Sequence, residues 1–367
     1  MSRLTIAITV LMLLALLSAA CVPIQAPSGA SSTETSSAET LDAKIAEAMR
    51  GAGPPISAEA TIMDWPPEMG GEWTVLREGA NGWTCLPGMP YYPEGIGRPM
   101  CIDEVWLDFM KARIAGEEFA PVTKPGVAYM LAGGGGPSIV DPFVTEPGPD
   151  EEWIIDAPPH MMILTPGDIS GYSRTPGPQP WAMFPDTSFK HLMLAVPMPV
   201  ETDDASLDPK IAEAMRSAGP PISAGATIMD WPPEMGGEWT VLREGTNGWT
   251  CLPGMPYYPE GIGRPMCIDE VWLAFMKARI AGEEFAPVTK PGVAYMLAGG
   301  GGPSIVDPFV TEPGPDEEWI IDAPPHMMIL TPGDLSGYSR TPGPQPWAMF
   351  PDTSFAHIML AIPMPAQ

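Results

Sequence analysis

Positive charge is scarce in this sequence. Lys and Arg together number 18 against 45 Asp and Glu in 367 residues, which gives a formal net charge of −27. Proteins that bind nucleic acid need a basic surface to neutralise phosphates, so we expect no nucleic-acid partner. The acidic excess runs through the whole chain, with 21 acidic residues in 41–200 and 19 in 207–366. An acidic protein of this kind is kept soluble by its charge when it is exported.

Recognisable catalytic motifs are missing too. The sequence contains no GxSxG and no HExxH, two patterns that mark common hydrolases. The glycine run 133–136 lacks the Lys-Ser/Thr of a phosphate-binding loop, so we expect a turned connection there. An enzyme that uses His160 or His191 as acid or base is the third functional hypothesis, because no nucleophile or orienting partner is identifiable beside either residue.

Long apolar runs are confined to the N-terminus. Residues 1–20 carry a single cation, then an uncharged apolar stretch and three small residues. This pattern is typical of a secretory signal peptide that is too short to span a membrane. Residues 17–21 resemble the lipobox of bacterial lipoproteins. The resemblance implies that Cys21 is lipidated and that its acyl chains, palmitate among them, anchor the protein to the bilayer of the cell envelope. An ordinary signal peptide cleaved after Ala20 is the alternative.

Two connecting segments have little to bury. Residues 22–40 contain no aromatic side chain and consist mainly of Ser, Thr, Ala and Pro. Such a composition cannot offset the entropy of an ordered chain, so residues 21–40 are predicted to form the lipidated cysteine and a disordered tether. The other connection, 201–206, is short and acidic and is predicted to be a linker.

The rest of the sequence is one domain written twice. Residues 41–200 and 207–366 match without a gap at an offset of 166 and differ at ten positions. We therefore predict a tandem repeat with domain 1 over 41–200 and domain 2 over 207–366. Each copy has enough aromatic and aliphatic residues for a core, so each is expected to fold by itself.

Each repeat contains one pair of cysteines. Cys85 and Cys101 lie in the first copy, and Cys251 and Cys267 lie in the second. An even pair in an exported domain predicts a disulfide bond, and a spacing of 16 residues matches no common zinc or redox motif. On the chain-entropy model each disulfide stabilises its domain by about 3 kcal/mol.

The periodicity of each copy predicts an α+β domain with mostly short antiparallel strands, about two helices and long Pro/Gly-rich loops. Helices are expected over 41–50 and from the capping residue Asp103 to Gly116. The Asn-Gly pair within 78–82 predicts a hairpin between the strands on either side of it. The strands expected in the first copy are 60–65, 72–77, 83–86, 126–131, 152–156, 160–164 and 191–197.

Histidine is the rarest chemically informative residue, with four in the chain. Each stands in a His-x-Met triplet on a predicted strand, where alternate side chains share a face. Imidazole and thioether together suit copper, Cu(I) in particular. Ordinary packing of Met and His in a core is the alternative. The candidate ligands are His160, Met162, His191 and Met193 in the first copy, and His326, Met328, His357 and Met359 in the second.

The body of each repeat runs from Asn-Gly-Trp-Thr-Cys through Pro-Met-Cys-Ile-Asp to Pro-Pro-His-Met-Met. It resembles a bacterial hypothetical-protein pattern of unknown activity, which implies no residue roles. The leading hypothesis is a membrane-anchored cell-envelope lipoprotein with two copies of a binding or structural module for an unknown envelope or extracellular ligand. An envelope copper-binding protein is the second hypothesis. The loop aromatics Trp83, Tyr91, Tyr92 and Trp181 are further candidates for contact with a ligand.

Overall fold

The computed structural model describes residues 32–197 and 206–362. The chain divides into two compact units, residues 1–40 and 41–367, and both repeats belong to the second unit. The predicted signal peptide, the lipidation site Cys21 and linker residues 201–205 lie outside the described residues. Within the described ranges, no helix is long and apolar enough to cross a membrane.

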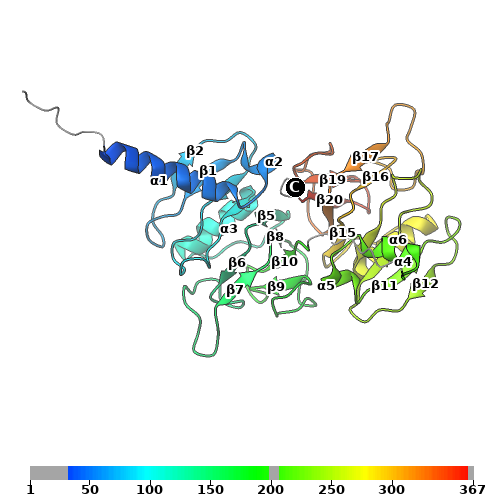
Figure 1. The fold of residues 1–367 in the computed structure, drawn as a ribbon, viewed down its shortest axis with the longest axis horizontal. Coiled ribbons are helices and arrows are strands. Elements are labelled where there is room, and N and C mark those ends of the chain that lie inside the picture. Colours follow the sequence, from blue (N-terminus) through cyan, green and yellow to red (C-terminus); the bar gives the residue numbers. More distant parts are fainter. Residues whose placement is uncertain (1–31, 198–205, 363–367) are drawn as a thin grey trace, which may run out of the picture. The chain divides into compact units, whose positions relative to one another are not determined.

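Each repeat contains an eight-stranded sheet, a two-stranded sheet and a few helices, which confirms the predicted α+β tandem fold (Figure 1). The elements of the first repeat are α1 (Ser32–Met49), α2 (Pro54–Ser57), β1 (Thr61–Asp64), β2 (Thr74–Arg77), β3 (Thr84–Leu86), β4 (Met100–Ile102), α3 (Glu104–Ala115), β5 (Gly126–Met130), β6 (Gly134–Gly136), β7 (Ile154–Ala157), β8 (His160–Leu164), β9 (Trp181–Met183) and β10 (His191–Ala195). α1 thus begins before the helix expected at residue 41.

The second repeat contains the same elements in the same order. They are α4 (Pro209–Met215), α5 (Pro220–Ser223), β11 (Thr227–Asp230), β12 (Thr240–Arg243), β13 (Thr250–Leu252), β14 (Met266–Ile268), α6 (Glu270–Ala281), β15 (Gly292–Met296), β16 (Gly300–Gly302), β17 (Ile320–Ala323), β18 (His326–Leu330), β19 (Trp347–Met349) and β20 (His357–Ala361).

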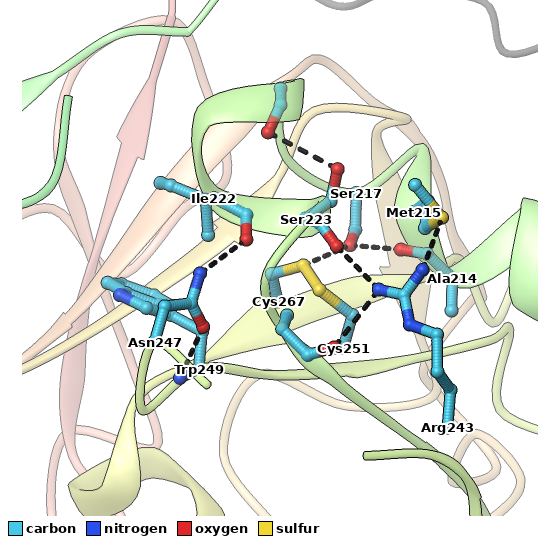
Figure 2. The surroundings of a disulfide bond; sticks show 12 residues. Ala214, Met215, Ser217, Ile222, Ser223, Arg243, Asn247, Trp249, Cys251 and Cys267 are labelled. Atoms are coloured by element: carbon cyan, nitrogen blue, oxygen red, sulfur yellow. Dashed lines mark hydrogen bonds between the residues drawn. A yellow bond between two sulfur atoms is a disulfide. The ribbon is translucent and has the colours of Figure 1, made fainter. Parts of the chain in front are cut away.

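The predicted hairpin between β2 and β3 is wrong. The strand order is β2-β1-β3-β4-β5-β8-β10-β9, so β1 lies between the two strands and pairs in parallel with β3. The connection between them is tied to α2 instead, because Asn81 donates from Nδ2 to the Ile56 carbonyl at 2.7 Å. Asn81 Oδ1 also accepts from the Trp83 backbone N–H, which orders the turn. Figure 2 shows the equivalent Asn247 bonds in the second repeat.

The disulfides form as predicted, between directly opposed residues of neighbouring strands. Cys85 pairs with Cys101 across β3 and β4, and Cys251 pairs with Cys267 across β13 and β14. The surroundings of the second disulfide include Ser217, whose Oγ lies 3.0 Å from Cys267 Sγ (Figure 2).

Helix α3 has the ends that the sequence predicts. Asp103 accepts a hydrogen bond from the Trp106 backbone N–H, and Gly116 closes the helix in the left-handed conformation at φ 70°. Asp103 also accepts from the Val127 backbone N–H at 2.6 Å, so one buried carboxyl fastens α3 to β5. Burial raises the pKa of Asp103 to about 7. The helix therefore has a fixed position against one face of the sheet.

The two faces of each sheet have different neighbours because side chains alternate along a strand. Met161 and Ile163 of β8 belong to a cluster of buried residues that includes both repeats. Met162 and Leu164 belong to another cluster, which contains α3 and no residue of the second repeat. Residues of the second repeat form the equivalent separate cluster around α6. One face of each sheet thus contributes to the shared core, and the other faces a helix of its own repeat.

The shared core is accompanied by reciprocal hydrogen bonds between the repeats. Tyr129 donates its hydroxyl to the Ala361 carbonyl at 3.3 Å, and Tyr295 donates to the Ala195 carbonyl at 3.1 Å. The two hydrogen bonds are equivalent: exchanging the repeats converts one into the other, as in a two-fold symmetric dimer. The hydroxyls of Thr165 and of its equivalent in the second repeat meet at 2.8 Å. The structure favours two repeats with a joint core over two independent folding units.

Candidate functional site

The face of the sheet beneath α3 contains a pocket, and the second repeat has the same pocket beneath α6. Each has a cavity volume of about 80 Å³. The walls are mostly methionine and aromatic side chains from α3, β5, β8, β9 and β10. All four predicted ligands of the first repeat lie in its lining, namely His160, Met162, His191 and Met193, and the second pocket has their equivalents His326, Met328, His357 and Met359.

The strand register separates the two histidines within the pocket. Met162 lies opposite Met193, whereas His160 lies opposite Ala195 at one end of the β8–β10 pair. His191 lies at the other end, opposite Leu164. His160 and the partner of His191 are four residues apart on β8, which corresponds to about 14 Å, and side chains stand roughly perpendicular to a sheet. The register therefore favours two histidines at opposite ends of one cavity over a joint ligand set.

Nε2 of His160 is a buried hydrogen-bond acceptor without a partner among the described residues. Its Nδ1 lies 2.7 Å from the Pro158 carbonyl, an acceptor, so this nitrogen carries the proton of the neutral ring. Burial lowers the pKa of His160 and keeps the ring neutral. Nε2 then has a free lone pair, and it is buried with no hydrogen-bond partner among the described residues, although the side chain is 4% exposed. Nε2 of His326 is in the same situation.

His191 is enclosed by aromatic rings. The ring centroid of Trp106 lies 4.9 Å away and that of Phe184 5.5 Å away, both in edge-on arrangements. Nδ1 of His191 is 2.9 Å from the Phe189 carbonyl. Burial, and to a smaller extent the positive charge of Arg113, lower the pKa of His191 to about 3. At neutral pH this imidazole is uncharged.

Trp106 is a buried donor without an acceptor. The residue is 1% exposed and lines the pocket, and its Nε1 has no hydrogen-bond partner in the described part of the chain. Trp272 repeats this arrangement in the second copy. A buried N–H without an acceptor costs about 1–3 kcal/mol. The same unpaired donor in both copies is therefore a feature that a bound group would explain.

Arg113 places a positive charge in the wall of the pocket. It is 8% exposed and donates from Nε to the Pro142 carbonyl at 2.5 Å and from Nη2 to the Tyr92 hydroxyl at 2.5 Å. Its guanidinium lies 6.0 Å from the ring centroid of Phe184. None of the ion pairs formed by the described residues includes Arg113. Its charge is thus held by neutral groups alone.

Phe184 supports the pocket in a strained conformation. Its φ of 50° lies in the left-handed region, where a bulky side chain is rare, and the equivalent Phe350 has a φ of 53°. Such a residue costs about 1–3 kcal/mol and persists where its surroundings fix it. Here the ring contacts both His191 and Arg113.

The glycine run, expected as a turned connection, forms strand β6 against β7 instead. A Cβ on Gly135 would lie 2.1 Å from the Ile154 carbonyl oxygen, so the pairing with β7 requires glycine. A Cβ on Gly134 would lie 2.9 Å from Met130 Cε and 3.4 Å from His160 Cε1. The run therefore lets the backbone pass close to the His160 end of the pocket.

Several residues of this site do not stand out in the sequence. Arg113, Trp106 and Met130 were not candidates, although Trp106 and Arg113 are seven residues apart on one helix and so share a face. An arginine on the apolar stripe of a helix is the signal that could have found it. The aromatics expected to lie exposed in loops are buried or partly buried: Trp83 donates to Gln345 of the other repeat, Tyr91 donates to the Pro66 carbonyl, and Trp181 lines the pocket.

No protein-family model matches the chain, and neither a curated protein nor a solved structure is similar enough to count as a match. Function is therefore inferred from the chemistry of the pocket.

Proposed function

We propose that this protein is a membrane-anchored binding protein of the cell envelope that holds one small ligand in each repeat. The observation that carries the proposal is the pocket beneath α3, which recurs beneath α6 with equivalent lining residues. Pockets that bind small molecules are mostly apolar and contain a few polar groups that fix orientation. Among the described residues, both copies share an unpaired tryptophan Nε1 and an unpaired histidine Nε2, and the second copy adds Nε2 of His357.

Binding fits this pocket better than catalysis. The pKa of His191 is lowered to about 3 by burial, which makes its imidazole a weak base at neutral pH. The described lining contains one serine, Ser138, and its hydroxyl already donates a hydrogen bond to the Glu151 carboxylate at 3.0 Å. Among the described lining residues there is neither a thiol nor a carboxylate to act as a nucleophile.

Methionine methyl groups offer a direct test in the full-length protein. With ¹³C-methyl methionine, the signals of Met130 and Met162 report on the pocket, whereas Met161 on the opposite face of β8 serves as the control. The probes are acetate, acetamide, ethylammonium and Cu(I). We expect at least one probe to shift the pocket signals saturably in both repeats while Met161 stays unchanged. If none of the four probes does so, the binding function is refuted.

A variant can close one pocket and leave the other open. A Cβ on Gly136 would meet nothing nearer than Met183 Cε at 4.0 Å, so Gly136→Val adds volume to the cavity without a backbone clash. Binding should be lost in the first repeat and kept in the second. Gly171→Val is the matched control, since a Cβ there has no neighbour within 4 Å and the residue is exposed.

Copper binding is the second candidate function. The observation that favours it is the free Nε2 lone pair of His160, whose ring is oriented by the Nδ1 bond to a carbonyl as in many metal sites. Met130 lies directly opposite His160 across β5 and β8, and Met162 follows on the same face. These three residues would hold the ion, and copper would supply soft Lewis acidity there. His191 belongs to the other end of the cavity, and Met193 lies between the two ends, opposite Met162.

Titration with Cu(I) in competition with a chelator separates this candidate from the first. Two equivalent ions per chain are expected if copper is the ligand, and His160→Ala should halve that number. His191→Ala is the matched control, because the register places its ring away from the proposed ligands. Affinity no tighter than micromolar would remove copper from consideration.

A further inference from the structure

The charge of the pocket is opposite to that of the domain. The first repeat has 21 acidic residues against 9 basic ones over 41–200. The lining of its pocket contains two arginines, Arg98 and Arg113, and no Asp or Glu among the described residues. The second pocket likewise has Arg264 and Arg279 and, over the described lining, no acidic residue. A site that collects cations in an acidic domain selects for an anionic ligand.

The interactions of Arg113 leave its charge uncompensated. A guanidinium has five N–H donors, and the partners of this one are a carbonyl, a hydroxyl and the sulfur of Met89 at 4.0 Å. All three are neutral. Buried charges in proteins are normally paired, because removal from water is costly. A ligand that brings a negative charge would remove this cost, whereas a cation such as Cu(I) would add to it.

The unpaired atoms indicate what else the ligand must offer. Trp106 Nε1 is a donor and calls for an acceptor, which a carboxylate oxygen supplies. Trp106 and Arg113 both lie near His191: the Trp106 ring contacts it directly, and the ring of Phe184 contacts both His191 and Arg113. The two donors therefore belong to the same end of the cavity.

The volume limits the size of the ligand. A cavity of about 80 Å³ is roughly half the size of one that takes up benzene in another protein, at about 150 Å³. The pocket therefore suits a ligand of no more than a few non-hydrogen atoms. The walls are otherwise methionine and aromatic carbon, which accommodates a short alkyl group beside a charged one.

We infer that each pocket binds a small carboxylate, with Arg113 and Trp106 as its donors in the first repeat and Arg279 and Trp272 in the second. This inference rests on the proposed binding function and specifies its ligand class. The carboxylate end faces the guanidinium and the indole N–H. The alkyl end lies among the methionine side chains of the lining.

The decisive comparison is acetate against acetamide, which has the same shape and no charge. In methionine-methyl spectra of the full-length protein, acetate, propionate and lactate should bind saturably at one site per repeat. Acetamide should bind at least about tenfold more weakly, the effect of losing charge-assisted hydrogen bonds. If acetamide binds as tightly as acetate, or if ethylammonium or Cu(I) binds and no carboxylate does, the carboxylate inference is wrong while the binding function stands. If no probe binds, both fail.

Variants of the two donors test the assigned roles. Trp106→Phe keeps an aromatic ring and removes Nε1, so acetate should bind about tenfold more weakly in the first repeat. Arg113→Gln should abolish acetate binding there. The unaltered second repeat is the internal standard, and its methyl signals show that the chain is folded. Arg174→Gln is the matched control, because Arg174 is exposed and paired with Asp186. Unchanged acetate affinity in Trp106→Phe and Arg113→Gln would overturn the inference.

Discussion

The buried histidines make a quantitative prediction about stability and pH. Burial lowers the pKa of His191 to about 3, whereas an unfolded chain has an ordinary value of about 6.5. Between these values the unfolded state binds a proton that the folded state does not. Stability must then fall as the pH falls through this window. From pH 6.5 to 4.5 the loss is about 2 kcal/mol for this one residue, since each full unit is worth about 1.4 kcal/mol.

The buried carboxyl of Asp103 changes the stability of the protein with pH in the opposite direction. Burial raises its pKa to about 7, so the folded state binds more protons than the unfolded state between pH 7 and about 4. That term adds stability as the pH falls. Asp269, with a pKa raised to about 6, behaves in the same way. The pH profile of the wild-type protein alone therefore combines opposing terms and does not isolate the histidine.

A difference between two proteins at two pH values does isolate it. The free energies of unfolding of wild type and His191→Gln are measured with urea, through tryptophan fluorescence, at pH 6.5 and 4.5. Whatever the variant loses at pH 6.5 through altered packing, it should lose about 2 kcal/mol less at pH 4.5, because it no longer carries the histidine penalty. An equal difference at both pH values would refute the lowered pKa and the neutral imidazole assumed for the pocket.

Four further predictions concern the frame around the pockets. Tyr129→Phe removes a buried hydroxyl that bonds to the other repeat and should cost about 1 kcal/mol in urea unfolding; no loss would mean that the bond is dispensable. Joint replacement of Cys85 and Cys101 by Ala should cost about 3 kcal/mol, and peptide mapping without reductant should find this pair linked in the wild type. Cys21→Ser should release the protein from membranes and end labelling by palmitate; continued labelling would place the lipid elsewhere. Residues 41–197 produced alone should dimerise or precipitate, and a soluble monomer in a sedimentation experiment would contradict the shared core.

The sequence predicts local structure well where a local cause decides it. The strand 160–164 and the helix that starts after Asp103 and stops at Gly116 follow from alternation and capping, which act over a few residues. The pairing of strands depends on contacts between distant residues and does not follow from such local causes. β1 lies between β2 and β3, and Asn81 bonds to α2. Nothing in the Asn-Gly pair distinguishes this arrangement from a hairpin.

The candidate site was predicted in part. Alternation along β8 and β10 correctly places His160, Met162, His191 and Met193 on the pocket face. The register between β8 and β10 could not be predicted from the sequence, and this register places the two histidines at opposite ends of the strand pair. Arg113 was overlooked because a basic residue on a helix is normally exposed. Its burial depends on the loop that carries the Pro142 carbonyl, which is far from it in sequence.

The arrangement of each sheet gives a physical reason for two copies in one chain. Along β8 the side chain of Met161 enters the core that the repeats share, and its neighbour Met162 lines the pocket. The strands that shape a binding site are therefore the strands that hold the repeats together. A second site that is fixed through a packed core is held more firmly than one on a flexible linker, where linker length governs how often both sites engage. Duplication thus supplies the partner surface that covers one face of each sheet, and the two pockets remain on the opposite faces.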